Sequence, residues 1–153
     1  MISMLKKLFI LMIVAMVLAG FTSVSDQLKA RMEQMPQHYS QFDVKIGWAV
    51  TGGNSATTIN GIIKNVRYAM MDDIEIWVSL LDAKGNQLAR SVDYVIPNRL
   101  DRDDVAPFTI NLPTAAPKNA KLIFTYKYVG NDGGEDGGGS ANWLQSFESG
   151  LGI

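Results

Sequence analysis

The chain has 153 residues, with 14 lysines and arginines against 15 aspartates and glutamates, 47% hydrophobic residues and no cysteine. This length suits one ordinary domain. The missing cysteine excludes disulfides, thiolate zinc sites, iron–sulfur clusters and cysteine nucleophiles, and the near-neutral charge provides no basic field for nucleic acid or anionic lipid.

Residues 1–25 have the layout of a secretory signal peptide. Lys6 and Lys7 precede an uninterrupted apolar run over residues 8–21, and small polar residues follow it. As a helix this run would extend about 21 Å, whereas the hydrocarbon core of a bilayer is roughly 30 Å thick. We therefore expect an exported protein, periplasmic or extracellular, and an uncleaved N-terminal membrane anchor is the alternative.

Small residues also indicate where cleavage occurs. Ser23 and Ser25 satisfy the small-x-small rule for cleavage before Asp26. Phe21 stands where a bacterial lipoprotein would have its acylated cysteine. We therefore expect no lipid anchor and no stable membrane insertion after cleavage.

A short helix is predicted over residues 26–36. Leu28, Met32 and Met35 recur at spacings of four and three, which places them on one helical face, and Pro36 ends the pattern.

Beyond Pro36 the hydrophobic period changes to two, and turn residues recur about every ten positions. This pattern predicts an all-β domain over residues 40–129, an immunoglobulin-like antiparallel β-sandwich of six to seven strands. The candidate strands are Phe42–Val50, Thr57–Val66, Asp73–Leu81, Gln87–Val95, Pro107–Leu112 and Lys121–Val129. No βαβ pattern separates them, which disfavours parallel-sheet folds that hold cofactors at strand ends.

Alternation predicts which side chains face the core. In the segment 73–81 the aliphatic residues share one face, and Glu75, Trp77 and Ser79 share the other. In the segment 121–129 the predicted inward residues are Leu122, Phe124, Tyr126 and Tyr128. We expect these two strands to be the central core strands.

The C-terminal part has a different composition. Residues 130–140 are glycine-rich and acidic, typical of a flexible linker. In the apolar segment 141–153, Trp143, Phe147 and Leu151 recur at spacings of four with Leu144 beside them, which predicts one or two helical turns with an apolar stripe. Either the stripe docks on its own sandwich, or it is a tethered peptide that binds in a partner's groove.

Three segments, Gly61–Asn65, Ile76–Asp82 with Gly85, and Ala106–Ile110, resemble the FxLYD domain and its relatives. The resemblance covers roughly residues 42–129. It implies an immunoglobulin-like module of exported or membrane-tethered prokaryotic proteins, without assigned catalysis or ligand. The aromatic residues of the name-giving motif are absent, since Val78 and Leu81 occupy their positions.

The matching residues have structural explanations, and we interpret them as a structural motif: Gly61, Asn65, Asp82, Gly85, Pro107 and Phe108. Glycine within a strand indicates close approach of a large ring, for which Trp48 or Trp77 is the candidate. Asn65 is expected to bond nearby backbone, and Asp82 to cap the turn that Gly85 completes.

Candidate chemistry is sparse. His38 is the only histidine, and no nucleophile motif accompanies it, so we interpret it as a surface residue. Carboxylates cluster within residues 72–73, 101–104 and 132–136, but none of these clusters has the spacing of a calcium loop, and Arg99 and Arg102 can neutralise the second cluster. We therefore expect no enzyme activity, no cofactor and no metal site.

The remaining candidates for binding are aromatic residues. Trp77 is either an exposed platform or, as we prefer, a residue buried under the terminal segment. The sequence favours a non-catalytic module that acts by protein–protein contacts in the prokaryotic cell envelope, and a carbohydrate- or calcium-binding accessory module is the alternative. The candidate partner-binding residues are Trp77, Trp143, Leu144, Phe147 and Leu151. Oligomeric state and partner identity stay open.

Overall fold

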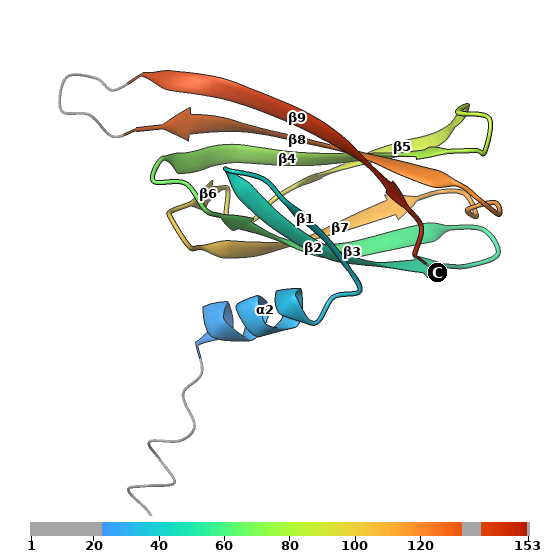
Figure 1. Cartoon of the computed structure of the whole chain (residues 1–153), viewed down its shortest axis with the longest axis horizontal. Coiled ribbons are helices and arrows are strands. Elements are labelled where there is room, and N and C mark those ends of the chain that lie inside the picture. The colour runs from blue at the N-terminus through green and yellow to red at the C-terminus, as the bar shows by residue number, and fades with distance from the viewer. Residues whose placement is uncertain (1–22, 133–138, 153) are drawn as a thin grey trace, which may run out of the picture.

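The computed structural model describes residues 23–132 and 139–152. In this part of the chain, two antiparallel sheets pack face to face and one helix lies outside them (Figure 1). The predicted all-β, immunoglobulin-like sandwich is confirmed.

The first sheet has the strand order β1-β2-β3-β7, and the second has the order β5-β4-β8-β9, with β6 paired to β4. All pairings are antiparallel. The first sheet contains β1 (Gln37–Ser40), β2 (Val44–Gly52), β3 (Thr57–Asn65) and β7 (Val105–Leu112). The second contains β4 (Met70–Leu81), β5 (Gln87–Tyr94), β6 (Arg99–Leu100), β8 (Lys121–Asn131) and β9 (Ser140–Gly150).

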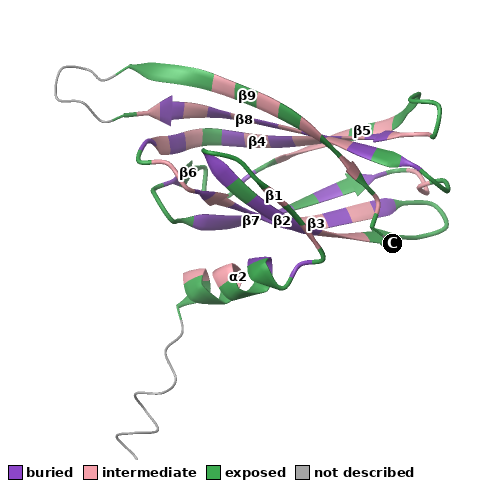
Figure 2. Ribbon diagram, in the orientation of Figure 1, coloured by how far each residue is buried: buried purple, intermediate pink, exposed green. Residues whose placement is uncertain are grey.

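The six expected strands are present, and three others were not predicted. β1 and β6 are too short, at four and two residues, for a period of two to identify them. The two strands expected at the centre, β4 and β8, are adjacent in the second sheet, and buried residues alternate along both (Figure 2). The inward side chains are those that alternation predicts, among them Ile76, Val78, Phe124 and Tyr126, each at most 1% exposed.

Helix α2 (Val24–Glu33) lies against the outer side of the first sheet. Its Met32 is buried and forms a small apolar cluster with Met35, Ile62 and Val105. A Cβ atom at Gly47 would lie 2.8 Å from the backbone oxygen of Met32, so glycine permits this close approach.

The N-terminus of α2 overlaps the predicted cleavage region. Ser23 is the N-cap, and its hydroxyl accepts a hydrogen bond of 3.1 Å from the backbone N–H of Asp26. Cleavage before Asp26 would therefore fall within the first helical turn. Residues 1–22, which carry most of the predicted signal peptide, lie outside the described residues.

The C-terminal segment is a strand, and the predicted helical stripe is wrong. A spacing of four is close to one helical turn, but it is also two strand repeats, so Trp143, Phe147 and Leu151 share a face in either structure. Pairing with β8 along residues 140–150 selects the strand. Residues 130–131 and 140 of the predicted linker belong to this hairpin, and residues 133–138 lie outside the described residues.

The structural motif is ordered largely as expected. Asp82 Oδ1 accepts hydrogen bonds from the backbone N–H groups of Lys84 and Asn86, and Gly85 has a φ of 88°. Asn65 Nδ2 donates to the backbone oxygens of Ala69 and Leu100, at 2.9 and 3.0 Å.

One detail of the motif is corrected. Trp48 and Phe108 both lie opposite Gly61 in strand register, on β2 and β7, but the ring atoms nearest to a Cβ at Gly61 belong to Phe108 and not to Trp48 or Trp77. A Cβ atom at Gly61 would overlap the Phe108 ring. Pro107, which precedes this ring, pairs with Ile62 in the same register.

Candidate interaction surface

The side chains of the second sheet that point away from the core form a continuous surface, here called the outer face. Strand register places them in rows across the four main strands. The members are Arg90, Val92 and Tyr94 of β5, Glu75, Trp77 and Ser79 of β4, Ile123, Thr125 and Lys127 of β8, and Leu144, Ser146 and Glu148 of β9.

Trp77 lies at the centre of the outer face and is partly exposed. Its Nε1 donates a hydrogen bond of 2.9 Å to Glu75 Oε2, and the guanidinium carbon of Arg90 lies 4.6 Å from the ring centroid. The predicted burial of Trp77 under the terminal segment is wrong, because that segment pairs beside β8 at the edge of the sheet. Trp77 is thus held in one orientation with part of its surface facing solvent.

A charged pair lies in the next row. Glu75 Oε1 accepts a hydrogen bond of 3.2 Å from Lys127 Nζ. The hydrogen bond from Trp77 lowers the pKa of Glu75, with Lys127 adding to the effect and desolvation opposing it. Tyr94 and Leu144 end this row on the two edge strands, 63% and 64% exposed. Two large exposed side chains therefore flank an ion pair.

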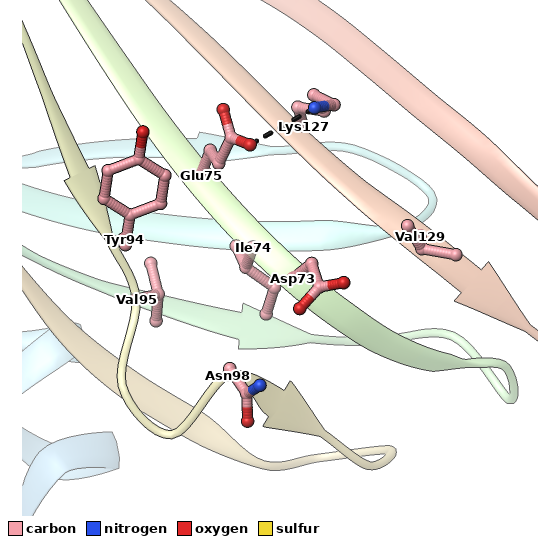
Figure 3. A pocket seen from close by; sticks show the side chains of 8 residues that line it. All are labelled: Asp73, Ile74, Glu75, Tyr94, Val95, Asn98, Lys127 and Val129. Atoms are coloured by element: carbon pink, nitrogen blue, oxygen red, sulfur yellow. Dashed lines mark hydrogen bonds and ion pairs between the residues drawn. The ribbon is translucent and has the colours of Figure 1, made fainter.

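An open hollow of about 390 Å³ adjoins this row. It forms where the β4–β8 register is interrupted between Asp72 and Glu75, and Asp73 there has a φ of 51°. Figure 3 shows Glu75 and Lys127 directed toward each other on one side of the hollow, with Tyr94 nearby. Two of the charged residues that line the hollow, Glu75 and Lys127, are therefore already paired with each other, and Asp73 is the third.

Two surface carboxylates elsewhere are bonded to basic groups. Arg99 Nε lies 2.7 Å from Asp72 Oδ1, and Lys64 Nζ lies 2.9 Å from Asp103 Oδ1. Lys64 lowers the pKa of Asp103 by hydrogen bond and charge. Among residues 23–132 and 139–152, no group of three or more histidines, cysteines, aspartates or glutamates is placed to hold a metal ion. His38 is exposed on β1, as expected.

A buried polar cluster, not identified from the sequence, lies between the sheets. Asp43 is fully buried, and its carboxylate accepts hydrogen bonds from the hydroxyls of Tyr126, at 3.0 Å, and Tyr128, at 2.9 Å. Arg67 Nη1 donates to the Tyr128 oxygen at 3.1 Å. The available signal was the inward position of both tyrosines, since buried hydroxyls need a partner.

The same cluster raises the pKa of both tyrosines. Burial and the neighbouring Asp43 charge raise the pKa of Tyr128 to about 12, although Arg67 opposes them. Burial raises the pKa of Tyr126 further, again with Asp43 contributing. Arg67 also lies 4.4 Å from the ring centroid of Trp143, so the cluster extends to β9.

The structure separates the five predicted partner-binding residues. Trp143 and Phe147 of β9, and Leu151 just after it, pack against the main core, which is the self-docked alternative. Trp77 and Leu144 lie on the outer face. Arg90 and Tyr94 add a basic and an aromatic side chain to the outer face. They were not predicted from the sequence, because hydrophobic residues alternate too little along β5 to indicate which face of that strand is exposed.

No protein-family model matches the sequence, and no curated protein matches it. Several solved structures are similar in arrangement. The GAE domain of GGA2p from Saccharomyces cerevisiae is 13% identical with a TM-score of 0.47, covering 74% of this chain and 96% of that domain. The ApaA protein of Bordetella pertussis is 15% identical with a TM-score of 0.46, covering 69% and 89%. The C-terminal domain of wzt is 13% identical with a TM-score of 0.44, covering 82% and 80%.

The strand arrangement defines this chain as an immunoglobulin-like β-sandwich module with one mixed aromatic and charged sheet face. Its resemblance to the FxLYD domain stays a prediction. No helix within the described ranges is long and apolar enough to cross a bilayer.

Proposed function

We propose that this chain is an exported, non-catalytic β-sandwich module, related to FxLYD modules, that contacts a protein partner in the prokaryotic cell envelope through its outer face. The observation that carries the proposal is the fixed, partly exposed Trp77 beside Arg90, with exposed Tyr94 in the neighbouring row.

The residue types fit a protein partner. Tryptophan, tyrosine and arginine dominate binding energy at protein interfaces, because they bury large areas and retain polar groups for hydrogen bonds. Trp77 and Arg90 already hold each other in place, so less side-chain entropy is lost on association. A broad sheet face also suits a protein surface better than a small ligand, which requires a concave site.

The same geometry weighs against the accessory-module alternative. A sugar that stacks on Trp77 needs a bare ring face, whereas the Arg90 guanidinium lies against the ring. Calcium requires several oxygen ligands around one point, whereas Asp72 and Asp103 bond to Arg99 and Lys64. Protein recognition is therefore the function that we favour.

Export is supported by the N-terminal layout of two lysines, an apolar run and small polar residues. The FxLYD resemblance implies the same location. The N-terminal layout and the FxLYD resemblance are both features of the sequence, so the support for export does not depend on the outer face.

The test is variant-dependent partner capture in the native envelope. The tagged protein is crosslinked in the cells that produce it, and captured proteins are quantified for the unaltered chain, Trp77→Ala and Tyr94→Ala. Tyr68→Ala is the matched control, since Tyr68 is 86% exposed and lies outside the outer face. We expect the two outer-face variants to lose a partner that the control retains.

Equal capture by all four proteins would contradict the proposed surface. Saturable binding of a glycan panel or of calcium, measured by calorimetry and abolished by Trp77→Ala or Asp72→Asn respectively, would support the alternative instead. Circular dichroism of each variant verifies that the fold is retained.

A further inference from the structure

The four sheet edges differ in how well they are protected against pairing with another strand. An edge strand presents unpaired backbone N–H and C=O groups, and proteins block such edges with short strands, prolines, charges or covering segments. β1 is only four residues long. On β7, Pro107 has no N–H group, and the N–H of Thr109 donates to Asp93 Oδ2 of β5 at 2.7 Å.

β5 is protected by the same contact. Its Asp93 reaches across to β7, Arg90 adds a charge, and its pairing with β4 shifts register between Leu80 and Leu81. These features leave β5 and β7 packed together at one side of the sandwich. Neither strand is available along its full length.

β9 is less protected along most of its length, because its single charge, Glu148, and the contacts with Gln37 both lie near its C-terminal end. It is eleven residues long, contains no proline, lysine or arginine, and pairs with β8 in unbroken register. Within the described ranges it pairs with no other strand, and Figure 1 shows it along one border of the molecule. In an antiparallel pair, alternate residues direct both backbone groups away from the partner. These groups on β9 remain available to another strand.

The far end of β9 is covered, and this limits the free stretch. Gln37 Oε1 accepts from the Ser149 hydroxyl, and Gln37 Nε2 donates to the backbone oxygen of Leu151, both at 2.8 Å. The outward backbone groups of residues 140–148 remain unpaired with another strand, and the midpoint of this stretch is Leu144. Leu144 is 64% exposed and points to the outer face.

This arrangement is self-complementary. When two copies pair antiparallel about a two-fold axis at Leu144, each leucine lies opposite its equivalent, and Glu148 lies opposite Ser140 of the other copy. The one charge of β9, Glu148, already bonds to Lys121 at 2.7 Å. No like charges therefore face each other across the axis.

We infer that β9 is a dimerisation edge that pairs antiparallel with β9 of a second copy of this chain, centred on Leu144. The two second sheets then join into one sheet through β9, and the two outer faces lie on the same side. The inference does not depend on an envelope partner.

The test is the oligomeric state of the protein purified from the cells that produce it. Sedimentation velocity from micromolar to millimolar concentration should show a monomer converting to a dimer. Leu144→Lys should weaken association by about tenfold or more, since the two-fold axis places two lysines opposite each other. Asn142→Lys, a second exposed change on β9, should also weaken it.

The matched control is Leu88→Lys, because Leu88 is 44% exposed on the opposite edge strand of the same sheet. It should leave association unchanged. Hydrogen exchange should show protection within residues 140–148 that increases with protein concentration and no such increase within residues 87–94.

A monomer at every concentration would overturn the inference, and so would a dimer that Leu144→Lys and Asn142→Lys leave intact. Trp77→Ala and Tyr94→Ala should not alter the mass of the assembly, because Trp77 lies two strands from β9 and Tyr94 lies on β5. Failure of the dimer and failure of partner capture are thus separate results.

Discussion

The rings of Tyr39 and Phe147 stack with centroids 3.7 Å apart and planes 5° from parallel. Tyr39 belongs to β1 of the first sheet and Phe147 to β9 of the second. Phe147 stacks also on Phe124 of β8, at 4.9 Å. Aromatic contact therefore connects the edges of the two sheets, and the C-terminal strand contributes to the core.

Phe147→Ala should lower the free energy of unfolding by about 2–4 kcal/mol, because it removes a ring packed between two others. Urea unfolding at dilute protein concentration measures the loss. Leu144→Ala is the matched control on the same strand, and its exposed side chain should cost less than about 0.5 kcal/mol. Equal losses would show that β9 does not pack as described.

Gly61→Ala should destabilise the protein by about 1–3 kcal/mol, because the added methyl group overlaps the Phe108 ring. The cost should be smaller in a Phe108→Leu background, which makes the pair a double-mutant cycle. Gly150→Ala, where no atom lies within 4 Å of the added Cβ, serves as the control. Additive effects of Gly61→Ala and Phe108→Leu would refute the contact.

The buried tyrosines should make the protein sensitive to alkaline pH. The pKa of Tyr128 is raised in the folded state to about 12 from its ordinary value of 10.0. The folded state then binds more protons than the unfolded state, so the stability is present below pH 10 and falls as the pH rises toward 12.

Urea unfolding at several values between pH 9 and 12 measures this slope. Tyr128→Phe should reduce the slope, with Tyr126 responsible for what remains, whereas Tyr68→Phe at an exposed position should leave the decline in place. If Tyr128→Phe leaves the alkaline loss of stability unchanged, titratable groups other than Tyr128 cause that loss.

The proposed export predicts a mature protein that begins at Asp26. Mass spectrometry of the envelope or medium fraction determines the N-terminus, and Ser25→Phe should block processing because it removes a required small residue. Glu33→Phe, beyond the cleavage region, should be processed normally. Processing removes the N-cap Ser23, which should weaken the first turn of α2 by about 1 kcal/mol. An intact N-terminus in the membrane fraction would support the uncleaved anchor.

Alternation predicted the centre of the sandwich correctly because β4 and β8 are long and buried on one face. In β4, Ile76 and Val78 point inward while Trp77 points outward, as their positions predict. The predicted turn, capped by Asp82 and completed by Gly85, is also correct, since it depends on residues close together in the sequence. A short helix was also predicted correctly, but it spans Val24–Glu33 and not residues 26–36, so Met35 and Pro36 lie beyond its end.

Contacts between segments that are distant in the chain could not be predicted from the sequence. Phe108 faces Gly61 only because β7 pairs with β3, and 46 intervening positions give no sign of that register. Asp43 gives no sign in the sequence that it is buried, and only the packing of the two sheets brings Tyr126 and Tyr128 to its carboxylate.

The sequence by itself determined the β-sandwich class and the inward residues of its central strands, because side chains of a strand alternate whatever the strand pairs with. The tertiary structure alone decided that the last segment is a strand. Spacings of four at Trp143, Phe147 and Leu151 fit a helix and a strand equally, and hydrogen bonding to β8 distinguishes them. The same pairing turned Leu144 outward and left β9 with an open edge, since an edge exists only once the order of strands is set.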